Sequence, residues 1–376
     1  MTQPHASLLK LISAACIVSC ASLAQAQTEP IRIGALLSVT GGLAALGQNQ
    51  REGVLLAQKI VNERGGVNGR KLEIIVEDDA SSPDSAVPKT NALIHTQKVR
   101  AIIGPTGIAQ SVAIGAITQK LNVPVLAFTG LGPAVEQQRT CVFHLTPAQE
   151  LNARSMLSYA RDHNLKKVGV LHDTGYGQVI WNAMKGLTKE YGVEVVQQEK
   201  FDIAATDATT QAAKVKAAAP DAVFVMSASP VPFRNVRQVK LNVPIISVHG
   251  NATYEIVKGM GDAADNIIYP EFLVAEDPQP NQKEFVEAYK KEYNRLPKHF
   301  SAMGWDAVMS LVEGLKATQA DPSGEKLCAA LRKPYQGATT KYDFSAPDMG
   351  GMTLAGFTYS KLDKGVFTRL PYKPAK

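Results

Sequence analysis

The segment from residue 31 to residue 79 constrains the fold most, because it reads as a strand, a glycine-rich loop, a helix and a second strand. IRIGALL is a continuous apolar run of strand length, typical of a strand buried on both faces of a parallel sheet. Apolar residues then recur at helical spacing until Gly65-Gly66, where the pattern turns directly into LEIIVEDD. The order predicts a βαβ unit whose first loop lies at the carboxyl end of the sheet, where open α/β folds bind ligands.

The same alternation continues along the chain. Further short apolar runs, each followed by a helical pattern, are VRAIIGP, NVPVLAF, KKVGVLHD, PDAVFVMS and VPIISVH. We expect the helix after KKVGVLHD to cover residues 177–191. This repetition predicts an α/β fold built of doubly wound parallel sheets.

Two stretches, at 139–147 and at 267–278, interrupt the alternation of strands and helices. We interpret them as connections between two lobes. Removal of a predicted 26-residue signal from the 376 residues leaves 350, a length that also suggests two domains. Helical patterns return after the second connection, and short strands are expected around Tyr342, Phe357 and Phe367. We therefore expect lobe 1 to comprise 27–145 plus about 273–338, and lobe 2 to comprise 146–272 plus about 339–376.

The first 26 residues read as a cleavable secretory signal, with Lys10 before a short apolar run that ends in Ala24-Gln25-Ala26. A lipid-bearing variant with Cys20 as the anchor is an alternative that fits the residues less well. No later segment approaches about 18 uninterrupted apolar residues, so we expect no membrane-spanning helix. Export through this signal predicts a periplasmic location.

Several function classes find no support in the residues. The charge of +6 is spread as single Lys and Arg residues among acids, without the basic stripe of a nucleic-acid-binding surface. The histidines lie far apart and form no HExxH, so neither a metal nor a cofactor is expected. The loop TGGLAALGQ lacks the order of a phosphate-binding motif, and no G-x-S-x-G occurs. Asp78 and Asp79 more often serve as capping residues than as catalysts in such a position, so we expect no enzyme.

Loops at the carboxyl ends of the expected strands hold the candidate ligand-binding residues. A helix amino terminus with open backbone N–H groups suits a small anion such as a carboxylate. In the first lobe three such loops would converge on one crevice. In the second lobe Tyr176 stands between two glycines and is available to cover an apolar ligand, although packing on its own lobe is the alternative. The first-lobe candidates are Gly41, Gly42, Leu43, Thr106, Ile108, Ala109, Ser111, Thr129, Gly130 and Leu131.

Two cysteines, Cys141 and Cys328, remain once the signal is removed. In an oxidising compartment they form a possible disulfide that would close a long loop. Two unpaired thiols are the other possibility, because sequence does not place their Cα atoms. Both alternatives stay open at this point.

Together these segments resemble the periplasmic solute-binding proteins of branched-chain amino-acid ABC transporters. The motifs that carry the resemblance are IRIGALLSVTGGLAALG, EGVLLAQKIVNERGGVNGRKLEIIVEDDAS, IIGP, LNVPVLAF, KKVGVLHDTGYGQ and PDAVFVMSAS. The resemblance implies a type I, Venus-flytrap architecture with two lobes, a three-strand hinge and a ligand held in the cleft. It also implies backbone N–H and hydroxyl groups of 106–111 and 129–131 around the ligand carboxylate, and Tyr176 over its side chain.

One departure from the family pattern bears on the ligand. The acid that pairs with an α-ammonium is expected after VPIISV, but the chain reads SVHGNATYE, with His249 at that place and Glu255 further on. An amino acid bound without a nearby carboxylate would bury an unpaired ammonium, which is costly. We therefore expect an aromatic acid or a 2-oxo acid, with His249 as a donor to its carboxylate or oxo group. Ser227 and Gly250 complete the candidate set.

The resulting hypothesis is a monomeric substrate-binding component of an ABC importer that hands a small carboxylate to a membrane permease. Uptake of a branched-chain or other hydrophobic amino acid is the first alternative. A ligand sensor for a chemoreceptor or kinase is the second. In each case the ligand docks on one lobe, and closure of the second lobe completes the site.

Overall fold

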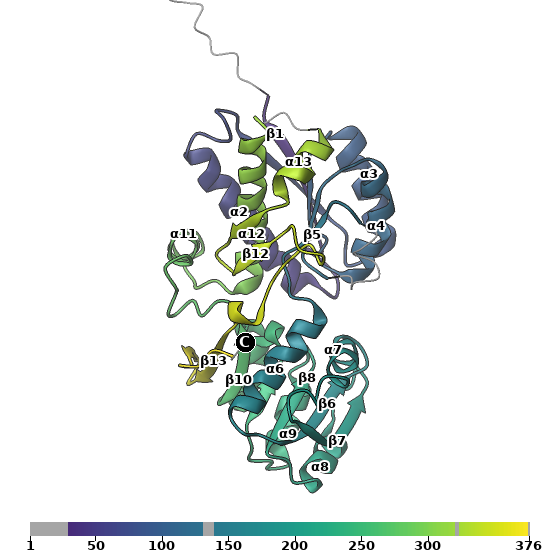
Figure 1. The fold of residues 1–376 in the computed structure, drawn as a ribbon, viewed down its shortest axis with the longest axis vertical. Coiled ribbons are helices and arrows are strands. Elements are labelled where there is room, and N and C mark those ends of the chain that lie inside the picture. The colour runs from purple at the N-terminus through teal and green to yellow at the C-terminus, as the bar shows by residue number, and fades with distance from the viewer. Residues whose placement is uncertain (1–28, 131–138, 320–322, 375–376) are drawn as a thin grey trace, which may run out of the picture. The chain divides into compact units, whose positions relative to one another are not determined.

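The structure is a computed structural model, and it describes residues 29–130, 139–319 and 323–374. The predicted signal peptide, 1–26, therefore lies outside the described residues. Most of the described strands belong to two sheets, one of five strands and one of seven. Helices cover both faces of each sheet (Figure 1). This arrangement confirms the predicted doubly wound α/β fold.

The first sheet is parallel throughout, in the order β2-β1-β3-β4-β5. β1 pairs with β2 over its full length, from Ile31 opposite Leu72 to Leu37 opposite Asp78. The predicted βαβ unit is therefore present, with a glycine-rich loop after β1. The strands are β1 Ile31–Leu37, β2 Leu72–Asp78, β3 Ile102–Ile103, β4 Val125–Ala127 and β5 Val142–His144.

Helices from two distant parts of the sequence pack around this sheet. α12 returns from late in the chain and lies against α2. Their backbones touch through two glycines, because a Cβ on Gly53 would lie 1.8 Å from the carbonyl oxygen of Ser301, and one on Gly304 would lie 2.2 Å from that of Gln50. The helices are α2 Ala44–Glu63, α3 Pro83–Asn91, the π-helical η1 Ala92–Thr96, α4 Ile108–Lys120, α11 Lys283–Tyr293, α12 His299–Ala317 and α13 Gly324–Leu331.

The second sheet has the order β14-β13-β10-β9-β8-β6-β7. Its strands are β6 Lys167–Asp173, β7 Glu194–Phe201, β8 Ala222–Met226, β9 Ile245–Ser247, β10 Ile267–Glu271, β13 Thr358–Asp363 and β14 Val366–Arg369. Its helices are α6 Gln149–Asp162, α7 Tyr176–Met184, α8 Thr209–Ala217, α9 Val231–Gln238, α10 Tyr254–Met260 and the short turns η2 His249–Asn251 and η3 Gly261–Ala264. Two strands, β11 Pro334–Gln336 and β12 Lys341–Asp343, pair with each other, and η4 Leu354–Gly356 precedes β13.

Two local expectations differ from this structure. The helix expected over 177–191 ends at Met184 and is followed by turns, because 185–192 carries glycines and lysines rather than a continued apolar face. The second sheet is also not purely parallel. β13 and β14 run antiparallel at its edge, because a short turn and not a crossover helix joins them.

The described chain passes three times between the elements of the two sheets. These connections lie between β5 and α6, between β10 and α11, and between β12 and β13. They agree with the expected hinge of three segments, which favours a defined closing motion over a flexible linker. The residue boundaries proposed for the lobes remain a prediction.

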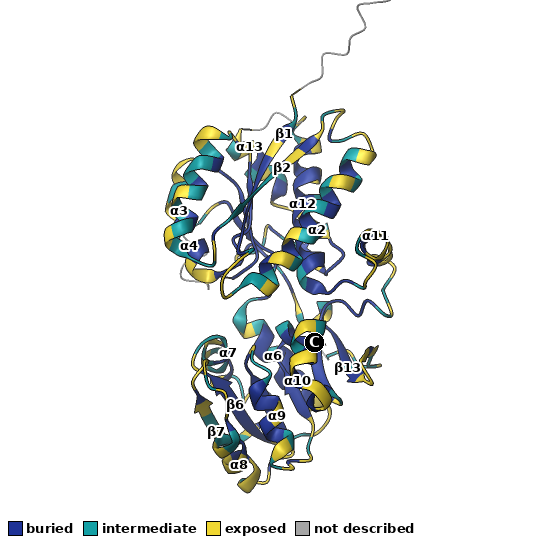
Figure 2. Ribbon diagram, turned by 180° about the vertical axis from the view of Figure 1, so that it is seen from behind, coloured by how far each residue is buried: buried dark blue, intermediate teal, exposed yellow. Residues whose placement is uncertain are grey.

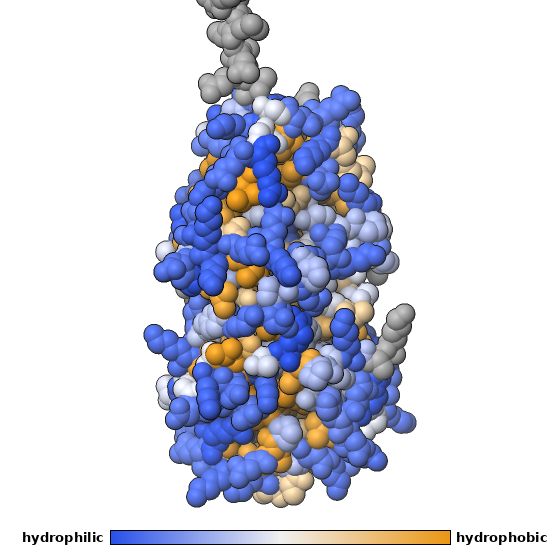
Figure 3. All heavy atoms as spheres, turned by 90° about the vertical axis from the view of Figure 1, so that its left-hand side faces the viewer, coloured by the Kyte–Doolittle hydropathy of each residue, from blue (hydrophilic) through white to orange (hydrophobic). Residues whose placement is uncertain are grey.

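The inner strands of the two sheets are buried, whereas the edge strand β7 and the outward faces of the helices are partly exposed (Figure 2). Hydrophilic residues dominate the face drawn in Figure 3, where apolar residues form only small groups. Across the described residues, none of the helices combines the length and the apolar character that crossing a bilayer requires.

Candidate ligand-binding site

The loop after β1 is held by the two acids at the end of β2. Asp78 accepts hydrogen bonds from the N–H of Val39 at 2.9 Å, the N–H of Thr40 at 3.2 Å and the hydroxyl of Thr40 at 2.6 Å. Burial raises the pKa of Asp78, but these bonds outweigh burial and leave the pKa below its ordinary value. Asp79 accepts from the hydroxyl of Ser38 at 2.6 Å, and burial raises its pKa. Both acids therefore anchor loops at this edge of the sheet.

Gly41, Gly42 and Leu43 offer fewer free donors than expected. The N–H of Leu43 donates to Ser81 Oγ at 3.0 Å, so the first loop is tied to the loop after β2. Gly41 has a φ of 83°, and a Cβ there would lie 2.5 Å from the carbonyl oxygen of Ala80. The turn therefore requires glycine at this position. A Cβ added to Gly42 would meet no atom within 4 Å.

The hydroxyl of Thr106 serves the protein itself. It donates to Gln50 Oε1 at 2.7 Å and accepts from the N–H of Ser38 at 3.1 Å, and the side chain is buried. This bond connects the second loop to α2 and to the end of β1. Thr106 therefore positions the loops that surround the candidate site.

The start of α4 brings the other residues of the second loop together. Ile108 is 43% exposed and Ala109 is exposed, whereas Ser111 is buried. Within the described residues, Ser111 Oγ has no hydrogen-bond partner. The first N–H groups of a helix have no intrahelical acceptors. The turn therefore presents an apolar side chain, backbone donors and a buried hydroxyl.

Thr129 and Gly130 follow β4 and are buried. The carbonyl oxygen of Thr129 accepts a hydrogen bond from His144 Nδ1 at 2.7 Å, which ties this loop to β5. Leu131, the third predicted residue of this loop, lies outside the described residues.

Three residues of the second lobe form a hydrogen-bonded cluster. Asn152 on α6 donates to the hydroxyl of Tyr176 at 2.9 Å and to Nδ1 of His249 at 2.8 Å. Tyr176 begins α7 and His249 begins η2, so three separate elements converge. Sequence reasoning identified Tyr176 and His249 but missed Asn152, because an Asn inside a helix carries no motif that marks it.

The hydrogen bonds of Asn152 fix which hydrogens the cluster presents. Because Nδ1 of His249 accepts from the amide, the neutral imidazole carries its hydrogen on Nε2. Burial lowers the pKa of His249 to about 4 and raises the pKa of Tyr176. At neutral pH the cluster is therefore uncharged, and it offers the Nε2–H of His249 and the O–H of Tyr176 as donors.

Ser227 and Gly250 lie on the two loops beside the cluster. Ser227 Oγ accepts the N–H of Ser229 at 3.0 Å, and the carbonyl of Ser227 accepts from Asn251 at 2.7 Å. Ser227 is therefore occupied in joining the loops after β8 and β9. Gly250 faces Phe300, because a Cβ added to it would lie 4.0 Å from the Phe300 ring.

Two aromatic rings lie beside the imidazole of His249. Its ring centroid lies 6.0 Å from that of Phe272 and 5.5 Å from that of His299. Phe272 packs in turn on Phe357 at 4.4 Å, and His299 packs on Phe300 at 4.0 Å. His299 and Phe300 open α12, so their approach to His249 depends on the packing of distant helices and is not visible in the sequence.

A family comparison matches residues 30–359 to a family described as periplasmic binding protein. The chain belongs to this family. A curated relative, the leucine-, isoleucine-, valine-, threonine- and alanine-binding protein of Pseudomonas aeruginosa, is 26% identical over 332 residues, which cover 86% of this chain and 88% of the relative.

Solved structures of transporter substrate-binding and solute-binding proteins share the fold. A branched-chain amino-acid transporter substrate-binding protein of Streptococcus pneumoniae, in complex with isoleucine, has a TM-score of 0.80 at 23% identity and covers 91% of this chain and 100% of its own. A solute-binding protein of R. palustris, in complex with benzoate, has a TM-score of 0.78 at 22% identity and covers 91% and 95%. These likenesses show that the chain has the two-lobed fold of type I periplasmic binding proteins.

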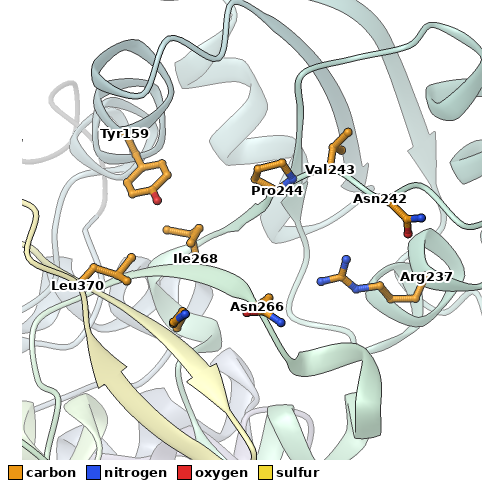
Figure 4. A pocket seen from close by; sticks show the side chains of 9 residues that line it. Tyr159, Arg237, Asn242, Val243, Pro244, Asn266, Ile268 and Leu370 are labelled. Atoms are coloured by element: carbon orange, nitrogen blue, oxygen red, sulfur yellow. The ribbon is translucent and has the colours of Figure 1, made fainter.

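A cavity of about 520 Å³ lies elsewhere in this periplasmic binding protein (Figure 4). Its lining includes Pro244 and Asn266, which precede β9 and β10, together with Tyr159, Arg237 and Leu370. It is therefore at the amino ends of these parallel strands, whereas His249 follows the carboxyl end of β9. Ligands of open α/β sheets bind at the carboxyl ends, so this cavity is separate from the candidate site.

A disulfide joins Cys141 and Cys328, with 5.7 Å between their Cα atoms. Cys141 directly precedes β5 and Cys328 lies on α13. The bond spans 187 positions of the sequence. It therefore links two elements of the first lobe of this periplasmic binding protein that are far apart in the chain.

Proposed function

We propose that this periplasmic binding protein captures a small carboxylate, an aromatic acid or a 2-oxo acid, between its lobes. It delivers this ligand to the membrane permease of an ABC importer, as a monomer in the periplasm after export through residues 1–26. It acts by binding and release, without turnover. The observation that carries the ligand class is the uncharged cluster of Asn152, Tyr176 and His249.

His249 stands where the family resemblance implies an acid for an α-ammonium. Burial alone lowers its pKa to about 4, whereas an adjacent carboxylate would raise it. Among the described residues, its ring makes a hydrogen bond with Asn152 and ring contacts with Phe272 and His299. Glu255 is exposed on α10. An ammonium placed beside His249 would be desolvated without a counter-charge, which is costly.

The hydrogens that the cluster offers suit an acceptor instead. The Nε2–H of His249 and the O–H of Tyr176 are donors to a carboxylate or oxo oxygen. The rings of Tyr176, Phe272 and Phe300 provide apolar surface for an aromatic ligand. Solved structures with this fold contain isoleucine in one case and benzoate in another. The proposed ligand class therefore rests on the residues of the site and not on the fold.

One observation favours the alternative of an amino acid. Asp173 ends β6, three positions before Tyr176, and is fully buried. Its Oδ1 accepts the N–H groups of Gly175 and Gly177, but within the described residues its Oδ2 has no hydrogen-bond partner. A carboxylate oxygen in this state would suit an ammonium group.

Calorimetric titration of the mature protein tests the two ligand classes. The ligands are benzoate, 4-hydroxybenzoate, a phenyl 2-oxo acid and leucine. We expect at least one acid to bind and His249→Phe to weaken that binding by about ten- to hundredfold, the value of one hydrogen bond to a charged group. His95→Gln, at an exposed position, is the matched control. Tight binding of leucine that disappears in Asp173→Asn, with no binding of the acids, would replace the proposal by the alternative.

Small-angle scattering tests the capture step. A ligand that contacts both lobes only when they close shifts the population toward the closed form. The radius of gyration should therefore fall when the acid that binds in calorimetry is added. An unchanged radius at saturating ligand would contradict capture by closure.

A further inference from the structure

His299 is a buried imidazole without a hydrogen-bond partner. It opens α12 and is 1% exposed. Neither Nδ1 nor Nε2 makes a hydrogen bond within the described residues. A buried polar group left in this state costs free energy that a bonded ligand atom would recover. His299 was not among the residues predicted to bind the ligand.

The position of His299 places it beside the proposed site. Its ring centroid lies 5.5 Å from that of His249, at an angle of 51°. Asn152 occupies Nδ1 of His249, so the Nε2–H of His249 and both nitrogens of His299 remain for a ligand. His249 belongs to the second lobe and α12 packs in the first, so a ligand held by both rings would join the lobes.

Burial is the main reason why both rings stay neutral. Burial, His249 and Lys298 together lower the pKa of His299 well below its ordinary value. These two groups are the titratable neighbours that act on His299. The Nζ of Lys298 lies 3.8 Å from Glu271 and 3.9 Å from Glu276, so its charge is drawn toward those acids.

Two donors of the first-lobe loops are already occupied within the protein, although Ser111 Oγ at the start of α4 has no partner among the described residues. The hydroxyl of Thr106 is occupied by Gln50 and Ser38, and the N–H of Leu43 is occupied by Ser81. The histidine pair has no such internal partners for its remaining nitrogens. It therefore offers buried nitrogens without internal partners to the charged end of a ligand.

We propose that His249 and His299 together form the subsite for the ligand's carboxylate, and that the pair takes up one proton from solvent as the anion binds. The inference rests on the proposed function. An anion favours the charged form of a nearby imidazole, and the resulting charge-assisted hydrogen bond is stronger than a neutral one. An acid then binds more tightly as the pH falls.

Calorimetry in two buffers that differ in ionisation enthalpy, phosphate and Tris at the same pH, measures this proton uptake. The probe is benzoate, or the best-bound acid of the series described above. We expect net proton uptake by the wild type. His299→Phe should reduce the uptake and weaken affinity by about ten- to hundredfold. His299→Gln, which retains a donor, should recover part of the affinity without the proton. His95→Gln serves as the control, and thermal melting identifies any variant that is unfolded.

Two outcomes overturn the inference while leaving the proposed function intact. The first is an acid that binds the wild type with no proton uptake. The second is a folded His299→Phe protein with unchanged affinity and uptake. Binding of leucine alone, with no acid bound by the wild type, would instead overturn the proposed function and the inference with it.

Discussion

Removal of the Cys141–Cys328 disulfide is expected to destabilise the first lobe strongly. The bond closes a loop of 187 positions. In the chain-entropy description, a loop of this length restricts the unfolded chain by about 18 cal/mol/K, which corresponds to about 5 kcal/mol at 25 °C. Measured losses for native disulfides run from about 2 to 5 kcal/mol. We therefore expect Cys141→Ser with Cys328→Ser to lower the free energy of unfolding by an amount in this range.

The two tryptophans of the chain allow a local measurement. Trp305 is buried on α12, against which α13 with Cys328 packs. Trp181 lies on α7. In a Trp181→Phe background, urea unfolding followed by fluorescence reports the environment of Trp305 alone. The transition should move to lower urea in the double serine variant, and in the same way in wild-type protein treated with a reductant.

The single variants provide the control for this experiment. Cys141→Ser and Cys328→Ser each remove the bond, so both should lose nearly the same stability as the double variant. A large difference between them would indicate that packing of one sulfur matters more than the link. An unchanged urea midpoint in the double variant would refute the entropic reasoning.

Two further predictions concern the hinge and the helix contact. Burial, the largest influence, raises the pKa of Glu271 to about 7, so the folded protein keeps a proton that the unfolded chain releases near pH 4.5. Stability should fall by about 2.5 kcal/mol more in the wild type than in Glu271→Gln between pH 5 and pH 8, as measured by urea unfolding; parallel pH profiles would contradict this. Gly304→Ala would place a Cβ 2.2 Å from the Gln50 carbonyl oxygen and should cost about 3 kcal/mol by forcing α2 and α12 apart. Gly186→Ala, where nothing lies within 4 Å, should leave the melting temperature nearly unchanged.

The buried strands were predictable because burial on both faces leaves an uninterrupted apolar run. β6 and β8 are examples. β7 was missed, because it lies at the edge of the second sheet and reads EVVQQEKF, with polar side chains on its exposed positions. An edge strand with one solvent-exposed face alternates apolar and polar residues, so its sequence contains no continuous apolar run.

The candidate site divides in a similar way. Tyr176 and His249 stand in loops at strand ends, so the sequence indicated them. Asn152 and His299 lie on helices, and their importance depends on which helices meet, which no local pattern encodes. The occupied hydroxyl of Thr106 was also not predictable, because its partner Gln50 is 56 positions away.

The position of Asn152 gives the cluster a fixed direction. Both hydrogens of its amide point at partners, one at Tyr176 and one at His249, and each partner is left to point its own hydrogen away from Asn152. The donors that result are the O–H of Tyr176 and the Nε2–H of His249. A ligand group that brings lone pairs meets complementary hydrogens there, whereas a group that brings hydrogens meets more hydrogens. A single buried amide thus makes the cluster favour ligand groups that accept hydrogen bonds over groups that donate them, even when the ligand is uncharged.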